Sequence, residues 1–97
     1  MNPRLVALTG PLKAQVITLT AETSIGRGSS NHIVVSDPAL SRRHCLITGA
    51  EASFTLTDLG SSNGAYVNGV PVQERLLEHG DQLTLGDSVY IRAICTA

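Results

Sequence analysis

Apolar residues along this chain of 97 residues fall in short runs that turn-forming residues interrupt. Residues 54–58 alternate apolar and polar side chains, as a strand with one buried face does. Residues 14–19 and 89–94 are rich in Val and Ile, which favour strands. Nine glycines and four prolines are spread along the chain and leave little room for a long helix. The pattern predicts an all-β protein.

Turns or polar loops separate the expected strands, which cover residues 5–8, 14–19, 23–26, 32–35, 44–48, 54–58, 65–67, 83–85 and 89–94. Residues 72–79 are ambiguous, because Val72, Leu76 and His79 would share one face of a helix. A segment of about eight residues is only a marginal helix in water, so a loop with short extended pieces is expected there. Roughly ten to eleven short strands in a chain of this length predict a two-sheet antiparallel β-sandwich.

Four turn signals indicate where the chain reverses direction. Two Asn-Gly pairs, residues 63–64 and 68–69, each predict a tight hairpin turn, because both residue types tolerate positive φ. Residues 86–87 predict the turn of a final hairpin. Asp37-Pro38 predicts a turn that places Ser41 on a loop rather than in a strand.

The charge balance provides no overall attraction to polyanions. The formal net charge is −1, so neither a nucleic acid nor an anionic membrane surface is expected as a partner. Any anion site must therefore be local. Arg27, Arg42 and Arg43 are three of the seven basic residues, and Asp37 is the one acidic residue between the first and the last of them.

Two cysteines, Cys45 and Cys95, are too few for the disulfide framework of a small secreted domain. Cys45 lies in an apolar run and is expected to be a small buried hydrophobe. The chain shows no signal-peptide pattern, and no apolar run reaches the roughly 18 residues of a membrane span. A cytoplasmic location is expected. Residues 1–97 are expected to be a single domain cut from a longer signalling or regulatory protein.

Three short stretches carry the groups that bind a phosphate without reacting with it. Gly26-Arg27 and Ser41-Arg42-Arg43-His44 supply guanidinium and hydroxyl donors, and residues 61–64 supply serines and an Asn-Gly pair. An arginine fork gives two parallel hydrogen bonds to phosphate, while hydroxyls and loop amides complete the contacts to its oxygens. Because the three stretches adjoin core strands, a site on loops at one end of the sandwich is expected.

Each of these residues alone has a simpler interpretation. Arg27 by itself would be a solvated surface arginine, and Ser41 would be a loop serine that caps a turn. His44 begins an apolar strand and is expected to be a partly buried histidine whose ring hydrogen-bonds the preceding loop. The order and spacing of the three stretches together favour an anion site.

Gly26-Arg27, the Ser-x-x-His of residues 41–44 and the two Asn-Gly pairs together resemble the forkhead-associated (FHA) domain, a β-sandwich that binds phosphothreonine peptides. The resemblance covers nearly the whole chain, and the further matching segments are residues 58–64, 67–69, 80–81 and 85–86. One departure is Ala65, because the family usually has threonine after the first Asn-Gly pair. Some loss of local hydrogen bonding is expected from that alanine.

The resemblance implies a role for each matched residue. It implies that Arg27 and Ser41 hold the phosphate. Arg42 and Ser62 are implied to assist them, and Asn63 to hold the peptide backbone. The residues implied to support the site structurally are Gly26, His44, Asn68 and Gly69.

The resemblance also implies a partner. That partner is a phosphothreonine-containing protein or peptide, either in another molecule or within the full-length chain itself. The chain resembles in particular modules at the N-terminus of bacterial signalling proteins and transcription activators, which are linked to Ser/Thr kinases. A small apolar recess for the γ-methyl group is implied to favour phosphothreonine over phosphoserine.

Enzymatic alternatives lack their motifs. Gly26-x-Gly28 has no third glycine at position 31 and no following helix, so a dinucleotide-binding loop is not expected. No nucleophile-elbow sequence surrounds Ser41, so a Ser41-His44-Asp58 triad would be a coincidence of residue types.

His44, Cys45 and Cys95 lack the spacing of a metal site. No catalytic residue, no metal and no cofactor are therefore expected. The alternative that stays open is a β-sandwich that binds a protein partner independently of phosphate.

Overall fold

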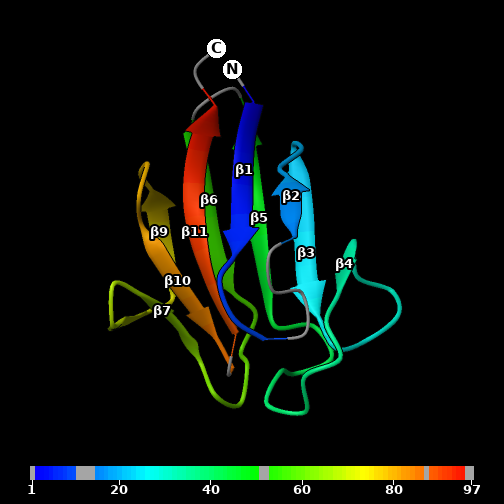
Figure 1. Ribbon diagram of the computed structural model, residues 1–97. Coiled ribbons are helices and arrows are strands. Elements are labelled where there is room, and N and C mark those ends of the chain that lie inside the picture. Colours follow the sequence, from blue (N-terminus) through cyan, green and yellow to red (C-terminus); the bar gives the residue numbers. More distant parts are fainter. Residues whose placement is uncertain (1, 11–14, 51–52, 87, 96–97) are drawn as a thin grey trace.

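The structure, a computed structural model, is a sandwich of two β-sheets and describes residues 2–10, 15–50, 53–86 and 88–95 (Figure 1). Eleven strands lie in these ranges, and none of their residues is helical. The all-β sandwich predicted from the strand pattern is confirmed. No helix in these ranges is long and apolar enough to cross a membrane.

The first sheet has six strands in the order β2-β1-β11-β10-β7-β8. Its strands are β1 (Asn2–Ala7), β2 (Val16–Thr18), β7 (Ala65–Val67), β8 (Val70–Val72), β10 (Gln82–Leu85) and β11 (Ser88–Cys95). Every neighbouring pair in this sheet is antiparallel. The pairing of β1 with β11 joins the first described residue, Asn2, to the last, Cys95.

The second sheet has five strands in the order β4-β3-β5-β6-β9. Its strands are β3 (Glu22–Gly26), β4 (Ile33–Val34), β5 (Cys45–Ala50), β6 (Ser53–Asp58) and β9 (Glu74–Leu77). One pair departs from the expected antiparallel arrangement, because β4 runs parallel to β3 with Ile33 opposite Ile25. The loop between them returns the chain to the level of Ile25 before β4 begins.

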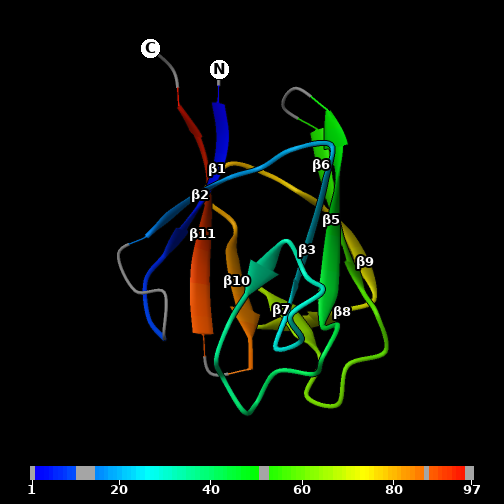
Figure 2. The same ribbon diagram turned by 90° about the vertical axis from the view of Figure 1, so that its right-hand side faces the viewer.

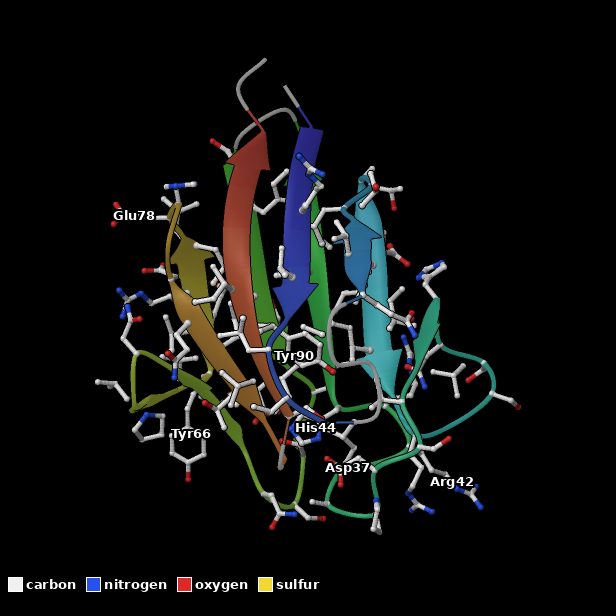
Figure 3. All side chains as sticks on the ribbon, viewed as in Figure 1. Asp37, Arg42, His44, Tyr66, Glu78 and Tyr90 are labelled. Atoms are coloured by element: carbon white, nitrogen blue, oxygen red, sulfur yellow. The ribbon has the colours of Figure 1, made fainter. Side chains whose placement is uncertain are left out.

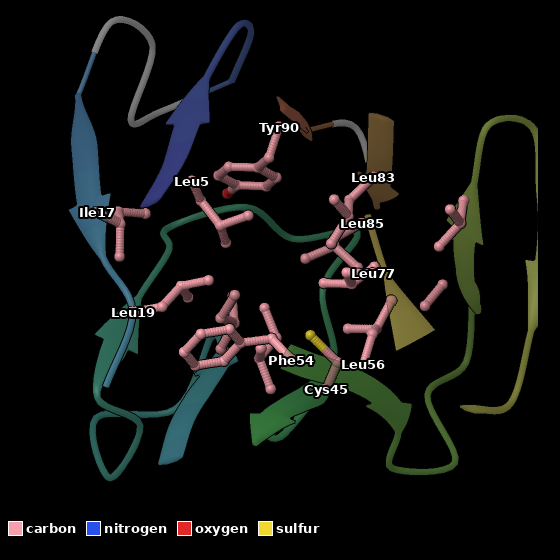
Figure 4. Packing of buried hydrophobic residues seen from close by; sticks show 14 of the residues in the cluster. Leu5, Ile17, Leu19, Cys45, Phe54, Leu56, Leu77, Leu83, Leu85 and Tyr90 are labelled. Atoms are coloured by element: carbon pink, nitrogen blue, oxygen red, sulfur yellow. The ribbon is translucent and has the colours of Figure 1, made fainter. Parts of the chain in front are cut away.

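The side chains between the two sheets are mainly aliphatic. Leu5, Leu83 and Tyr90 come from the six-stranded sheet and face Phe54 of the five-stranded sheet, and all four are at most 2% exposed (Figure 4). Burying a side chain of this size typically contributes about 1.5–3 kcal/mol. Cys45 is also fully buried, as expected of a small hydrophobe.

Residues 72–79 form more regular structure than expected. Val72 ends β8, and β9 pairs with β6 so that Leu77 lies opposite Phe54. Leu77 is buried whereas Leu76 is exposed, which is the alternation of an edge strand. The prediction of short extended pieces rather than a helix is therefore confirmed, and one of these pieces is the edge strand β9. The adjacent Leu76 and Leu77 hid the alternation in the sequence.

Two other expected strands are shorter than predicted. The strand expected at residues 32–35 is reduced to Ile33–Val34, and the backbone amide of His32 donates to the Ser24 hydroxyl instead of to a strand carbonyl. The strand expected at residues 14–19 is present as Val16–Thr18, and residue 14 lies outside the described residues.

The two Asn-Gly pairs behave differently. Asn68 and Gly69 have φ of 52° and 82° and form the turn of the β7–β8 hairpin, as predicted. Asn63-Gly64 does not form a hairpin turn, because β6 and β7 belong to different sheets and the chain crosses from one to the other there. The final hairpin joins β10 and β11 with Leu85 opposite Ser88, and its residue 87 lies outside the described residues.

The loops that carry the candidate residues lie at one end of the sandwich. The β4–β5 and β6–β7 loops extend from the same end in both views, next to the end of β3 (Figures 1 and 2). This end is remote from the start of β1, which lies at the opposite end of the molecule (Figure 1). The fold thus gathers three separate stretches of sequence at one edge.

Candidate functional site

Arg27 follows directly after β3 and is anchored to the β4–β5 loop. Its backbone amide donates to the Ser41 carbonyl over 3.0 Å, and its side-chain Nε donates to the Leu40 carbonyl over 3.1 Å. The side chain is otherwise exposed, and within the described part of the chain its two terminal amino groups have no partner. The Nε bond therefore orients a guanidinium whose other four N–H donors are available.

Ser41 and Ser62 meet although 21 residues separate them in the chain. The Ser62 amide donates to Ser41 Oγ over 3.0 Å. The Ser41 hydroxyl thereby accepts a hydrogen bond, and its own proton has no acceptor among residues that the structure describes. A serine hydroxyl both donates and accepts, so this proton is free to donate to a bound group.

Asn63 ties the β6–β7 loop to the β4–β5 loop. Its side-chain Nδ2 donates to the Ala39 carbonyl over 2.6 Å, and the residue is exposed. The amide oxygen and the second N–H have no partner in the described ranges. These two groups match the acceptor and donor pattern of a peptide backbone.

The ring of His44 also joins the β4–β5 loop to the β6–β7 loop. The ring is fully buried, Nδ1 accepts from the Ser41 amide over 3.1 Å, and Nε2 lies 2.8 Å from the Gly64 carbonyl. Because a backbone amide only donates and a carbonyl only accepts, the neutral ring carries its proton on Nε2. The predicted bond to the preceding loop is present. The bond to Gly64, and the complete burial, were not predicted.

Gly26 and Asn31 hold the end of β3 against the β4–β5 loop. A Cβ atom on Gly26 would collide with the Arg42 carbonyl oxygen, so the close approach requires glycine. Asn31 is 7% exposed, and its Nδ2 donates to the Gly28 carbonyl over 2.7 Å and to the Arg42 carbonyl over 2.6 Å. Sequence reasoning placed Asn31 in a polar loop, because nothing distinguishes it from the serines beside it.

Asp37, noted in the sequence for its turn and its charge, is a buried support of the β4–β5 loop. Its Oδ1 accepts from the Ala39 amide over 2.9 Å, and its Oδ2 accepts from the Ser88 hydroxyl over 3.3 Å. The carboxylate fixes the turn that precedes Ser41 to the start of β11.

Asn68 and Gly69 lie away from the cluster of Arg27, Ser41 and Asn63. Asn68 Nδ2 donates to Asp81 Oδ1 over 3.0 Å, and Asn68 Oδ1 accepts from the Gln82 amide over 3.0 Å. These bonds join the β7–β8 turn to the start of β10. Their contribution is to the scaffold that carries the loops.

Arg42 and Arg43 extend from the β4–β5 loop into solvent. Neither guanidinium has a hydrogen-bond or ion-pair partner among the residues described. Figure 3 shows Arg42 and Tyr66 towards opposite ends of the loop edge, with His44 and Asp37 between them.

Two recesses flank the cluster. One, of about 560 Å³, is lined by residues 28–30 and 42–43. The other, of about 400 Å³, lies on the Asn63 side, where the walls include Tyr66, Pro71 and Val72.

Ser41, His44 and Asp58 each have hydrogen-bond partners outside this set of three. Both ring nitrogens of His44 bond to backbone groups and neither contacts Ser41 Oγ, while Asp58 accepts from the amide and hydroxyl of Ser61. The Ser41-His44-Asp58 triad is therefore not formed. Burial raises the pKa of the Cys45 thiol well above its usual range, and the charge of Asp58 adds to the rise, so this thiol is not a nucleophile.

The described residues also offer no cluster of metal ligands. In the described part of the chain, no three His, Cys, Asp or Glu side chains lie close enough to hold a metal ion. The donors that do converge are a guanidinium, a hydroxyl and amides, which suit an anion rather than a cation.

The site is a cluster of arginine, serine and asparagine side chains that three loops present at one end of a two-sheet sandwich. The family model "FHA domain" matches residues 23–86. The chain belongs to the FHA domain family.

Curated relatives share this part of the chain. The glycogen accumulation regulator GarA of Mycobacterium tuberculosis is 39% identical over 66 residues, which are 68% of this chain and 41% of GarA. The FHA domain-containing protein FhaA of the same organism is 43% identical over 67 residues, which are 69% of this chain and 13% of FhaA. The chain thus spans less than half the length of these relatives.

Solved structures extend the likeness over the whole fold. A structure from a functional analysis of phosphothreonine-dependent FHA domain interactions has a TM-score of 0.91 and 33% identity, with full coverage of both chains. The FhaA FHA domain, solved in complex with the intracellular domain of Rv3910, has a TM-score of 0.86 and 35% identity. That match covers 93% of this chain and 98% of the FhaA domain.

Proposed function

We propose that this chain is a signalling module that binds a phosphothreonine-containing protein or peptide, and that Arg27 and Ser41 hold the phosphate. One observation carries the proposal: two hydrogen bonds tie Arg27 to the loop that carries Ser41, and both side chains keep donors without a partner among the described residues. Arg42 and Ser62 assist them, and Asn63 holds the peptide backbone. Such preorganised, charge-assisted donors suit an anion with several acceptor oxygens.

The charge of the ligand fits this arrangement. A phosphorylated threonine carries about −1.5 to −2 charge at neutral pH and three acceptor oxygens. The free N–H groups of Arg27 can bond two of those oxygens, and the Ser41 hydroxyl a third. Because the net charge of the chain is only −1, its overall electrostatic repulsion of a phosphopeptide is small.

The comparisons support the proposal at the level of the relatives. One structural neighbour comes from work on phosphothreonine-dependent interactions, and the FhaA domain binds the intracellular domain of another protein. The partner here is another phosphorylated protein or a phosphorylated segment of the full-length chain, in a pathway of a bacterial Ser/Thr kinase or a transcription regulator. Binding without turnover, a cytoplasmic location, and a single domain of residues 1–97 within a longer protein are parts of the same proposal.

The test compares matched peptides. A phosphothreonine peptide library first selects a ligand, and isothermal titration calorimetry then measures its affinity beside the unphosphorylated and phosphoserine forms. We expect binding of the phosphothreonine form, weaker binding of the phosphoserine form and none of the unphosphorylated form. Affinity should fall below about pH 6, where the phosphate takes up its second proton and loses charge.

Equal affinity for the phosphorylated and unphosphorylated peptides would support the phosphate-independent alternative instead. Equal affinity for the phosphoserine and phosphothreonine forms would remove only the preference for threonine. Neither outcome depends on which residues surround the phosphothreonine.

A further inference from the structure

We propose that the Asn63-Gly64 pair is a site of spontaneous chemical modification, at which deamidation of Asn63 abolishes binding of the phosphopeptide. Water is the co-reactant, and the reaction requires no enzyme and no cofactor. The modification itself follows from the local structure of the β6–β7 loop. Its effect on binding rests on the proposed function, in which Asn63 holds the peptide backbone.

The reaction is an attack of the Gly64 backbone nitrogen on the side chain of Asn63. The nitrogen loses its proton to solvent and bonds to Asn63 Cγ, the Cγ–Nδ2 bond breaks, and ammonia leaves with a proton from water. The product is a five-membered succinimide ring. Water then opens the ring at one of its two carbonyl carbons, which leaves either aspartate or isoaspartate at this position. Glycine favours the attack because it has no Cβ beside the nitrogen.

The two reacting groups have few restraints in the fold. Asn63 is exposed, and in the described part of the chain one bond, from Nδ2 to the Ala39 carbonyl over 2.6 Å, holds its carboxamide. The Gly64 amide has no acceptor there, and the bond that anchors Gly64 joins its carbonyl to His44 Nε2. Neither residue of the pair lies in a strand. A single hydrogen bond at the surface therefore restrains the carboxamide from turning towards the nitrogen.

Asn68-Gly69 provides an internal comparison, because it is the same dipeptide and Asn68 is also exposed. The carboxamide of Asn68 is held at both ends, since Nδ2 donates to Asp81 Oδ1 and Oδ1 accepts from the Gln82 amide, each over 3.0 Å. The Asn68 amide also donates to the Gln82 carbonyl over 2.7 Å, and the pairing of β7 with β8 fixes the backbone on both sides of the turn. Ring closure at Asn68 must break more bonds, so Asn63 reacts faster in the folded protein.

Either product changes the binding site. Aspartate replaces the Nδ2 donor by an oxygen, so the bond to the Ala39 carbonyl that joins the β6–β7 loop to the β4–β5 loop is lost. Because the Ser62 amide bonds Ser41 Oγ over 3.0 Å, the new negative charge also lies close to the serine that holds the phosphate. Like charges in an interface repel. Isoaspartate has both effects and adds a methylene group to the main chain next to Ser62.

The experiment follows both asparagines in one protein. The chain is incubated at physiological temperature in mildly alkaline and in mildly acidic buffer, both folded and in concentrated urea. Chymotrypsin cleaves after Tyr66 and places the two asparagines on different peptides, which mass spectrometry quantifies. Ion exchange then isolates the deamidated protein. Calorimetry compares its affinity for a phosphothreonine peptide with that of protein kept in the acidic buffer for the same time.

In the folded protein, Asn63 should react at least about fivefold faster than Asn68, because fewer hydrogen bonds must break. In urea the two rates should be nearly equal, since these bonds are absent. Both rates should rise with pH, because the attacking nitrogen must lose its proton. The deamidated protein should bind the peptide at least about tenfold more weakly. Saturating peptide should slow the reaction of Asn63 in the parent but not in Arg27→Ala, which should not bind it.

Two results overturn the inference. If Asn63 reacts no faster than Asn68 in the folded protein, the β6–β7 loop does not favour the modification. If the isolated deamidated protein binds the peptide as tightly as the unreacted protein, the modification does not abolish binding. Absence of binding of every phosphopeptide to unreacted protein would overturn the proposed function and the effect on binding, while the two reaction rates would still decide whether Asn63 is the modified residue.

Discussion

The amide of Ser62 donates to the hydroxyl oxygen of Ser41 across the gap between two loops. The bond engages the oxygen as an acceptor and directs its proton elsewhere, so Ser41 is set to donate. His44 joins the same two loops, because its ring bonds both the Ser41 amide and the Gly64 carbonyl. The site is thus assembled before any ligand arrives.

The first prediction concerns Arg27. Arg27→Ala should lower the affinity for a phosphothreonine peptide by about 2–5 kcal/mol, because a charge-assisted contact loses one partner. Its effect on stability should be small, since the residue is exposed and only the Nε bond to the Leu40 carbonyl is lost. Calorimetry and thermal melting on the same preparation measure both quantities.

His44→Ala is the matched variant for the scaffold. It should lower the free energy of unfolding by about 1–3 kcal/mol for the unpaired polar groups alone, with a further cost for the cavity. In a domain of this size each kcal/mol corresponds to about 4–8 °C in Tm. The division of roles fails if Arg27→Ala melts far below the parent, or if His44→Ala keeps full stability and loses only binding.

The second prediction compares the two asparagines of the Asn-Gly pairs. Asn63→Ala should weaken peptide binding about tenfold or more, with a change of less than about 0.5 kcal/mol in stability, because its bonded loop carbonyl is exposed to water. Asn68→Ala should lower the stability of the fold and leave peptide binding nearly unchanged. It removes the bonds to Asp81 and Gln82 and places a left-handed φ on alanine, which together cost about 1–2 kcal/mol.

Melting and titration of both asparagine variants decide the question. Equal losses of stability would mean that the β6–β7 loop depends on Asn63 as the β7–β8 turn depends on Asn68. A loss of affinity in Asn68→Ala at a temperature where it is fully folded would show that the β7–β8 turn contributes to binding.

The strand pattern predicted the sandwich because alternation and turn residues are local properties. In β6, Phe54 and Leu56 are buried while Thr55 and Thr57, which alternate with them, are not, as their order in the sequence suggested. The same local rule failed at Asn63-Gly64. An Asn-Gly pair indicates a local turn but carries no information on which sheet the following strand joins, and here β7 joins the other sheet.

The exposed members of the candidate site could be named from sequence, whereas its hidden supports could not. Arg27, Ser41 and Asn63 belong to recognisable stretches. Asn31 and Asp37 act through hydrogen bonds to the Arg42 carbonyl and the Ser88 hydroxyl, which are distant in the chain. Such bonds leave no periodicity or spacing, because they depend on how the loops pack and not on neighbouring residues.

The third prediction is that Gly26→Ala destabilises the fold. The new Cβ would collide with the backbone carbonyl of Arg42, and backbone cannot yield as the end of a side chain can. Overpacking of this kind costs about 1–3 kcal/mol. Gly28→Ala is the control, because its Cβ would stand 3.0 Å from the same oxygen and a small shift would relieve it. Thermal melting that ranks Gly28→Ala below Gly26→Ala would contradict this account.

The fourth prediction uses the phenol of Tyr90, which is fully buried. Its hydroxyl has no hydrogen-bond partner of good geometry among the described residues, and the proton of the nearby Ser88 hydroxyl goes to Asp37. Burial raises the pKa of Tyr90, and Ser88 offsets the rise only in part. Tyr90→Phe removes a polar group that gains little in the fold, so at neutral pH it should leave stability unchanged or raise it by up to about 1 kcal/mol.

The dependence of the free energy of unfolding on pH in the alkaline range gives the sharper measurement. A tyrosine ionises near pH 10 in the unfolded chain but at higher pH in the fold, so above about pH 10 rising pH favours the unfolded state. The parent should therefore lose stability from about pH 9 upward, and Tyr90→Phe should lose less over the same range. The raised pKa of Cys45 acts in the same direction in both proteins and cancels in the comparison. Urea unfolding at several pH values tests this, and parallel curves for the two proteins would show that Tyr90 does not contribute to the alkaline loss.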